Sequence, residues 1–405
     1  MSLIQPFAAL RPVEDRAADV VAPPYDVLST AEARVRAQGR PWSFLHISKA
    51  EIDLPESTDP YAPEVYTTAA GNLQRMISAR VLVRDPAPYY YVYRLVMGDH
   101  RQTGLVAAAS VADYDSNRIR KHEFTRPEKE DDRVRQIEAL NAQTGPVLLA
   151  YRSQPAVDDL LAAVTQAPPE VDLVADDGIG HSLWVVRDRA LIDKITAAFD
   201  AMDALYIADG HHRSAAASRV SGARAADAAA SRFLSVIFPH EQMQILDYNR
   251  AVRDLGGMTP EALLARLGEA FGVTPVAAAV RPKAPGVFGM YLGGQWYRLE
   301  IQPDRIPADP VGRLDVSLLA DNLLAPLLGI TDPRRDRRID FIGGIRGLGE
   351  LERRVDSGEM SVAFSLFPTR MEDLMAVADA GAVMPPKSTW FEPKLADGLV
   401  SHVLD

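Results

Sequence analysis

The sequence of 405 residues contains no cysteine. Disulfide bonds, thiolate nucleophiles, iron–sulfur ligation and cysteine-based zinc sites are therefore excluded. Long apolar runs are also missing, since no stretch approaches the roughly 20 residues that span a bilayer. Met1 to Phe7 lack the basic region and apolar core of a signal peptide. We therefore expect a cytoplasmic protein with no membrane partner.

Basic side chains are fewer than acidic ones. The chain has 44 basic against 55 acidic side chains and a net charge of −11. A general nucleic-acid-binding surface needs a basic patch that displaces phosphate counterions, so we expect no nucleic acid partner. Walker-type phosphate loops and the protein-kinase motif set are also missing. Only local basic clusters are left to bind a nucleotide.

The composition favours a folded protein of several domains. Apolar residues make up 47% and charged residues 24% of the chain, which is ordinary for a globular protein, and the length allows two or three domains. Alternating strands and helices predict a mixed α/β or α+β fold. We expect an N-terminal α/β region at 1–95, a core at 96–255 with an insertion near 152–201, and a C-terminal α/β region at 256–405.

The most informative stretch is an apolar run, Leu205–Ala208, followed by the turn dipeptide Asp209-Gly210 and an alanine-rich segment. The apolar run is typical of a buried strand. The dipeptide marks a turn, and the segment after it has no early helix breaker. The pattern therefore predicts a strand, a tight turn and a helix.

The predicted helix begins with His211, His212 and Arg213. Unpaired backbone N–H groups and the positive end of the helix dipole favour an anion there. Gly210 lets the backbone approach a ligand closely, and Arg213 offers a planar fork suited to phosphate oxygens. We therefore predict a phosphate or nucleotide site at Gly210, His211, His212 and Arg213. The alternative is that Asp209 caps the helix and the histidines lie on its surface.

A second segment with chemical content comes earlier in the chain. Glu123 stands in a predicted loop just before a helix, among four basic side chains. These neighbours are Arg120, Lys121, His122 and Arg126. Basic neighbours keep a carboxylate charged at neutral pH. Two roles stay open for Glu123, a catalytic carboxylate and a solvated loop residue paired with its neighbours.

Three further patterns predict elements around these segments. Aromatic and branched residues at Trp42–Ile47 favour a strand. A strand at 88–97 is followed by its hairpin partner at 104–111. The sequence Thr125–Glu128 has the Thr-x-x-Glu pattern of a capping box, with Pro127 near the first helical position.

These segments carry a resemblance. Asp209–Arg213 resembles the phosphate-binding motif of the ParB/sulfiredoxin superfamily, most closely its free-serine-kinase branch. The wider chain resembles domain-of-unknown-function family 1015 through Ala22–Val27, Lys121–Glu123, Asp209–Arg213 and Met384–Thr389. The resemblance implies a ParB/sulfiredoxin-like core with additional N- and C-terminal α/β regions.

In the serine-kinase branch a His-Glu pair comes before the Asp-Gly-His-His-Arg motif, and its glutamate acts on the substrate hydroxyl. The resemblance therefore implies that Glu123 is catalytic. It also implies a small-molecule kinase that moves a phosphoryl group between ATP or ADP and a serine-like hydroxyl metabolite. One departure is the insertion from Arg152 to Ala201, which separates the two motifs here.

Further roles follow for the charged residues near these motifs. Asp209 would join Glu123 in catalysis and either hold Mg²⁺ or orient a substrate group, because a carboxylate beside phosphates is repelled unless a cation intervenes. The candidates for positioning the substrate are Lys121, His122, Arg250 and Lys387.

Three alternatives to the kinase remain. With water as acceptor the same site becomes a phosphomonoester hydrolase acting on phosphoserine. A non-catalytic ParB-like nucleotide-binding switch is opposed by the acidic charge and the lack of an evident basic helix-turn-helix. A metal site of His211, His212 and another histidine is disfavoured, because adjacent histidines project differently from a helix. The sequence leaves the oligomeric state open, with a homodimer as one option.

Overall fold

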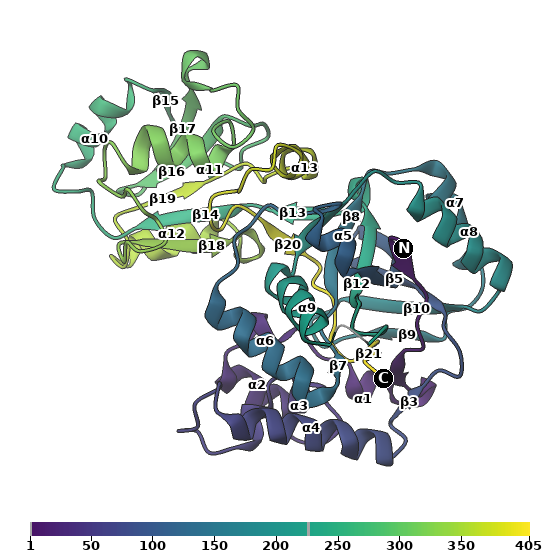
Figure 1. Ribbon diagram of the computed structural model, residues 1–405. Coiled ribbons are helices and arrows are strands. Elements are labelled where there is room, and N and C mark those ends of the chain that lie inside the picture. Colours follow the sequence, from purple (N-terminus) through teal and green to yellow (C-terminus); the bar gives the residue numbers. More distant parts are fainter. Residues whose placement is uncertain (1, 225–226) are drawn as a thin grey trace. The chain divides into compact units, whose positions relative to one another are not determined.

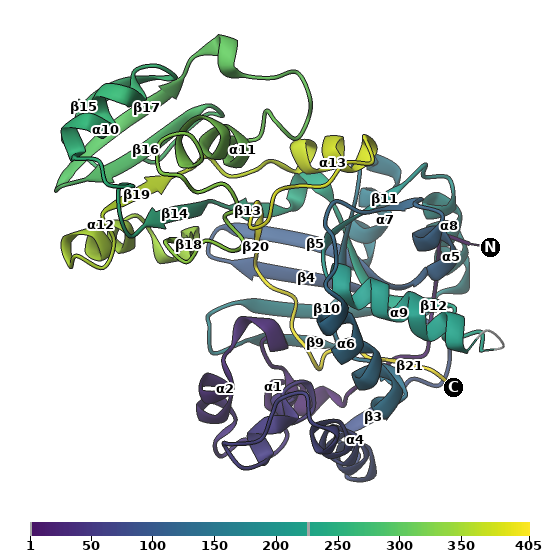
Figure 2. The ribbon, with the colours of Figure 1, turned by 60° about the vertical axis from the view of Figure 1, so that its left-hand side comes forward.

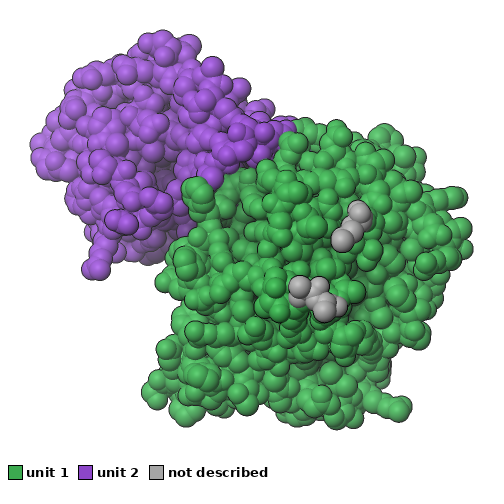
Figure 3. Space-filling model, viewed as in Figure 1, with its two compact units in different colours: residues 1–243, 393–405 green, residues 244–392 purple. Residues whose placement is uncertain are grey.

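The computed structural model describes residues 2–224 and 227–405 (Figures 1 and 2). The chain forms two compact units (Figure 3). Unit 1 consists of residues 1–243 and 393–405, and unit 2 of residues 244–392. Both contain a β-sheet and helices, so the predicted mixed α/β class is confirmed.

Unit 1 is built on a nine-stranded mixed sheet in the order β6-β11-β8-β12-β5-β4-β10-β9, with β1 paired to β5. The strands are β1 (Ile4–Gln5), β4 (Tyr90–Met97), β5 (His100–Ser110), β6 (Ile119–Arg120), β8 (Val147–Tyr151), β9 (Val171–Val174), β10 (Gly180–Val186), β11 (Leu205–Asp209) and β12 (Arg232–Pro239). The antiparallel β4–β5 hairpin confirms the strand predicted at 88–97 and its predicted partner at 104–111.

The helices of unit 1 form two groups, one packed against this sheet and one in a separate hydrophobic cluster (Figure 1). They are α1 (Ala17–Val20), α2 (Thr30–Ala37), α3 (Leu45–Ser48), α4 (Pro63–Ser78), α5 (Val111–Asp115), α6 (Pro127–Leu140), α7 (Pro155–Val164), α8 (Arg189–Asp200) and α9 (His211–Ala223). Helices α6 and α9 lie side by side in both ribbon views, and their contact buries Ile137 against Ala216 and Val220 (Figures 1 and 2). This contact fixes the start of α9, where the motif histidines lie.

The segment predicted as an insertion, 152–201, is part of the sheet and its core. Strand β10 pairs with β4 and β9 pairs with β10, so the segment extends the sheet at one side. Its helices contribute Val157, Ile195 and Phe199 to the main hydrophobic cluster of the unit. It leaves β11 and β8 paired with each other directly.

The last residues of the chain return to unit 1. Backbone bridges join Ala22 to Asp397 and Leu10 to Ser401. Short strands β2 (Leu10–Pro12) and β3 (Leu82–Arg84) pair with each other, and β21 (His402–Val403) pairs with β7 (Ala142–Gln143). The sequence-based boundary near 95 falls inside β4, which pairs with β5 along its length, and the region expected at 256–405 contributes residues 393–405 to unit 1.

Unit 2 contains a six-stranded antiparallel sheet in the order β15-β17-β16-β19-β14-β18. Its elements are β13 (Gln244–Leu246), β14 (Tyr248–Val252), α10 (Pro260–Leu267), β15 (Phe271–Val276), β16 (Val287–Leu292), β17 (Gln295–Ile301), α11 (Asp315–Leu319), β18 (Ile339–Gly343), α12 (Gly349–Asp356), β19 (Val362–Ser365), α13 (Met371–Asp379) and β20 (Trp390–Glu392). Strand β13 pairs with β20.

Two local predictions are wrong. Trp42–Ile47 does not form a strand: α3 begins at Leu45, and Phe44, Leu45 and Ile47 are buried in a hydrophobic cluster to which α2 and α4 contribute. The capping box at Thr125–Glu128 is also absent, because the N-cap of α6 is Arg126 and it makes no side-chain cap hydrogen bond. Pro127 does occupy the first turn of α6, as predicted.

No helix in the described part of the chain combines the length and apolar character needed to cross a membrane.

Acid should destabilise unit 1 through His181. This side chain is 3% exposed and its Nδ1 lies 2.7 Å from the hydroxyl of Tyr93. Burial lowers the pKa of His181 to about 4 from 6.5, so the unfolded chain takes up the proton first as the pH falls. The stabilisation is full above pH 6.5 and is lost towards pH 4, on the order of 3 kcal/mol.

His181→Gln should therefore reduce the dependence of the unfolding free energy on pH between 6.5 and 4, as measured by chemical denaturation. Equal slopes for His181→Gln and the parent would contradict the assignment.

Candidate functional site

The strand, turn and helix predicted around Asp209 are confirmed as β11, Gly210 and α9. Gly210 is the N-cap of α9, with φ of 101° and ψ of 28°. This left-handed conformation favours glycine. Because Gly210 has no side chain to cap the helix, the first N–H groups of α9 keep their donor capacity for an anion.

The two chemical segments of the sequence meet because β6 and β11 pair in parallel. Ile119 pairs with Leu205 and Arg120 with Tyr206. Both strands therefore end at the same edge of the sheet. His122 and Glu123 follow β6 there, next to the turn that follows β11. Residues at the carboxyl ends of neighbouring parallel strands are well placed to share a ligand.

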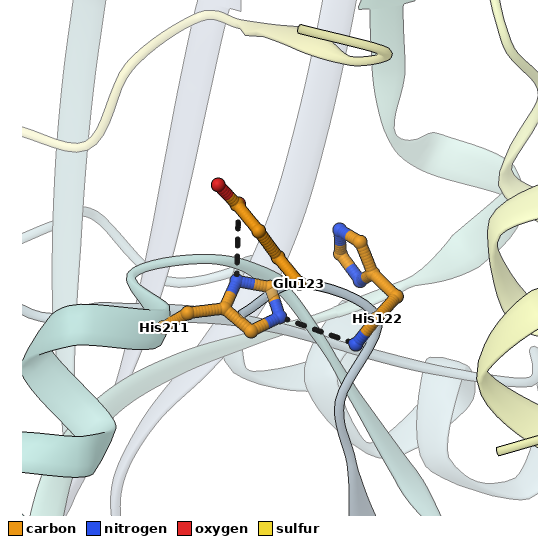
Figure 4. Close-up of side chains that lie close together, drawn as sticks. All are labelled: His122, Glu123 and His211. Carbon is orange, nitrogen blue, oxygen red and sulfur yellow. Dashed lines mark hydrogen bonds and ion pairs between the residues drawn. The ribbon is translucent and has the colours of Figure 1, made fainter. Parts of the chain in front are cut away.

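His211 contacts both Glu123 and His122 (Figure 4). Its Nδ1 is 3.7 Å from Oε2 of Glu123, and its Nε2 accepts a hydrogen bond of 3.4 Å from the backbone N–H of His122. Because Nε2 accepts, the neutral ring carries its proton on Nδ1, which faces the carboxylate. The rings of His122 and His211 meet edge to face, with centroids 4.4 Å apart.

Both histidines of this cluster are neutral at pH 7. Burial lowers the pKa of His122 to about 4, against a hydrogen bond with the backbone of Ile207 that raises it. Burial also lowers the pKa of His211 well below 6.5, and His122 adds to the effect. Glu123 differs from both, because its side chain is 55% exposed. The cluster therefore joins two buried neutral rings to one accessible carboxylate.

Asp209, which precedes the turn, forms ion pairs with Lys394 and Arg213. Nζ of Lys394 lies 3.3 Å from Oδ2 of Asp209, and Nη2 of Arg213 lies 3.8 Å from Oδ1. Burial opposes ionisation of Asp209, but Lys394 and Arg213 outweigh it and lower its pKa. A Mg²⁺ ion at Asp209 would have to displace these cations, so the metal role predicted for Asp209 does not fit this arrangement.

Arg213 turns into the protein. Its side chain is 11% exposed, its Nη1 donates to the carbonyl of Pro146, and its guanidinium lies against Gly210. A cavity of about 30 Å³ behind it is lined in part by Arg133 and Asp397. The cavity is too small for a nucleotide. Arg213 therefore braces the turn and adds positive charge beneath it.

The other motif residues are engaged as well. Nε2 of His212 accepts a hydrogen bond of 3.1 Å from the backbone N–H of Arg126, the N-cap of α6. Nζ of Lys121 lies 3.9 Å from the ring centre of Tyr114. His212 thus ties the start of α9 to the start of α6, and Lys121 is held beside the site by a cation–π contact.

Arg250 and Lys387, predicted to position the substrate, belong to unit 2. Nη2 of Arg250 donates to the backbone carbonyl of Lys387 at 2.8 Å. Burial lowers the pKa of Arg250 to about 10. Their role in binding a substrate stays a prediction.

Lys394 is the residue that the sequence reasoning missed. From this part of the chain the sequence analysis named Lys387 alone as a substrate-positioning candidate. The backbone leaves unit 2 between these lysines, so that Lys394 reaches Asp209. The signal in the sequence was Asp209 itself: a carboxylate next to the predicted anion site needs a cation as partner.

Gly210→Ala should destabilise the turn. A Cβ at Gly210 would lie 3.0 Å from Nε of Arg213, in addition to the cost of the left-handed conformation. We expect the free energy of unfolding to fall by at least about 1 kcal/mol in denaturant titrations. Gly222→Ala is the control, because a Cβ there meets no described atom within 4 Å and alanine should stabilise α9 by about 0.5–1 kcal/mol. Equal effects of the two changes would contradict the strained turn.

Comparison with known proteins gives the family. No curated protein matches the chain. Solved structures with a distant likeness include a free serine kinase mutant in complex with AMP, which is 14% identical. The match covers 71% of this chain and 87% of that one, with a TM-score of 0.37.

A second is a conserved hypothetical protein from Pyrococcus furiosus, which is 14% identical; the match covers 73% of this chain and 94% of that one, with a TM-score of 0.36. A third is C-terminally truncated SbnI from Staphylococcus aureus, which is 13% identical; the match covers 73% of this chain and 86% of that one, with a TM-score of 0.39. These scores are too low to support a function. The family model described as "Protein of unknown function (DUF1015)" matches residues 4–317. The chain therefore belongs to the DUF1015 family.

Proposed function

We propose that unit 1 is a small-molecule kinase, which binds the phosphates of ATP or ADP at the N-terminus of α9 and transfers a phosphoryl group to a hydroxyl metabolite. The observation that carries the proposal is the parallel pairing of β6 with β11, which brings the accessible carboxylate of Glu123 beside the first turn of α9. A serine-like acceptor follows from the sequence resemblance.

Phosphoryl transfer requires stabilisation of the moving charge and alignment of the nucleophile. The backbone N–H groups after Gly210 and the dipole of α9 serve the first need. Lys394 adds a cation at the edge of the turn, where its side chain is 24% exposed. Asp209 holds Lys394 in this position, which gives that carboxylate an orienting role.

Glu123 serves the second need as general base. Its carboxylate accepts the proton of the substrate hydroxyl as the oxygen attacks phosphorus, and the bond to the leaving nucleotide breaks. His211 faces this carboxylate with Nδ1 and so restrains its orientation. Because His211 is buried and neutral, it holds Glu123 without adding charge.

Mg²⁺ would enter with the nucleotide. This ion keeps several waters and binds phosphate oxygens with one or two carboxylates rather than a dedicated protein cage. Asp209 is paired with Lys394 and Glu123 serves as the base, so the phosphate oxygens and water would hold most of the ion. When bound, Mg²⁺ would neutralise part of the phosphate charge.

Phosphorus NMR tests the proposal. The protein is incubated with Mg²⁺ and ATP, ADP or phosphoserine, each with and without L-serine. A phosphomonoester signal that requires both nucleotide and serine would establish the kinase. Inorganic phosphate from phosphoserine without nucleotide would instead assign a hydrolase, and no reaction in any sample would contradict phosphoryl transfer to serine.

Glu123→Gln should abolish most turnover and spare nucleotide binding. Loss of a general base lowers kcat by about a hundredfold to ten-thousandfold, whereas the amide keeps the size of the side chain. The matched control is Glu128→Gln, in the exposed first turn of α6, which should retain the kcat of the parent. Full activity of Glu123→Gln would exclude this residue as the base.

Lys394→Gln should weaken nucleotide binding. The change removes the cation nearest to Asp209 and leaves that carboxylate to repel phosphate. We expect a Kd about tenfold higher at low salt, with less dependence on ionic strength. Titration calorimetry at two salt concentrations measures both quantities. Lys194→Gln, at an exposed position of α8, is the control, and an equal loss for both would argue against a phosphate role of Lys394.

A further inference from the structure

Three side chains of metal-ligand type meet at the ends of β6 and β11 (Figure 4). His122, Glu123 and His211 each offer one ligand atom, and these atoms all lie within 4.8 Å of one another. In the described part of the chain this is the one group of three or more such residues. The proposed reaction uses Glu123 and the restraint from His211, and it leaves His122 without a role.

His122 has the arrangement of a metal-binding histidine. Its side chain is 3% exposed, and its Nδ1 has no hydrogen-bond partner among the described residues. The hydrogen bond with the backbone of Ile207 therefore uses Nε2. A ring N–H that donates to a backbone carbonyl fixes the other nitrogen as a lone pair, which is the usual second contact of a metal-bound imidazole. A buried lone pair of this kind needs a ligand.

His211 and Glu123 complete the set. Nδ1 of His211 faces Oε2 of Glu123 at 3.7 Å, a separation that two ligands of one ion adopt. Coordination through Nδ1 moves the ring proton to Nε2, and the contact given up is the long one of 3.4 Å with the amide of His122. Glu123 is in an exposed loop, so its carboxylate can close the remaining distance.

We propose that His122, Glu123 and His211 bind one divalent transition-metal ion, with Zn²⁺ as the representative case. Two imidazoles and one carboxylate suit such ions, whereas Mg²⁺ prefers a shell of oxygen atoms. Three protein ligands leave a fourth position open for water or a substrate oxygen. His211 is the first residue of α9, so the ion would lie next to the turn at Gly210.

The metal site does not depend on phosphoryl transfer. It shares Glu123 with the proposed kinase, but it is measured without nucleotide or acceptor. A protein that binds the ion and transfers no phosphate keeps the metal site and loses the kinase. A protein that transfers phosphate with Mg²⁺ and binds no transition metal does the reverse.

The experiment uses the full chain after removal of metals with EDTA. Titration calorimetry with ZnCl₂ should give one ion per chain, and MgCl₂ at the same concentrations should give no comparable heat. Glu123→Ala should lower the Zn²⁺ affinity at least about tenfold, because loss even of an outer contact costs a metal site about 10–100-fold. The exposed position of Glu123 makes this variant suitable for a folded comparison.

His212→Ala is the matched control. His212 is adjacent to His211 in α9, but its Nε2 is directed to the backbone of Arg126. This variant should bind Zn²⁺ as the parent does, whereas His211→Ala should lose the ion. Since His211 is buried, folding of both histidine variants is checked by circular dichroism.

The parent protein gives an independent readout that needs no variant. Addition of Co²⁺ should produce the visible absorption of an ion with nitrogen ligands, and Zn²⁺ should displace it. Absence of one-to-one binding in the parent would overturn the proposal. An unchanged affinity in Glu123→Ala, or an equal loss in His212→Ala, would do so as well.

Discussion

The site depends on the parallel pairing of two short strands, β6 and β11. Only Ile119 with Leu205 and Arg120 with Tyr206 form this pairing. It brings together two segments that are far apart in the sequence, and every contact between them follows from it. Because the next residues of each strand leave the sheet at the same edge, the carboxylate of Glu123 lies beside the N-terminus of α9.

The groups at this edge of the sheet differ in charge because they differ in burial and in the cations beside them. His122 and His211 are held neutral by desolvation, while Asp209 stays ionised because Lys394 and Arg213 compensate for its burial. The exposed carboxylate of Glu123 is therefore the group best placed to exchange a proton with a bound molecule. The helix dipole and Lys394 favour a negatively charged ligand at the same place.

Local signals in the sequence were sufficient for the turn and insufficient for the cluster. The strand, Gly210 and helix follow from residues next to one another, and a glycine there is required by the backbone. The contact of His211 with His122 arises from strand pairing, which no local pattern encodes. The sequence disfavoured a metal site that contains both His211 and His212, and His212 indeed projects towards α6.

Tertiary context also overrode local preference elsewhere. Trp42–Ile47 has strand-like residues, but burial among helices decides its conformation.

Binding of an anion at the first turn of α9 can be measured directly. The chain has eight histidines, so selective ¹⁵N-histidine labelling reduces the amide spectrum to eight signals, which single substitutions assign. On addition of ADP or inorganic phosphate, we expect the amide signals of His211 and His212 to show the largest chemical-shift changes. Unchanged His211 and His212 signals at saturating ligand, or larger shifts at the other histidines alone, would contradict it.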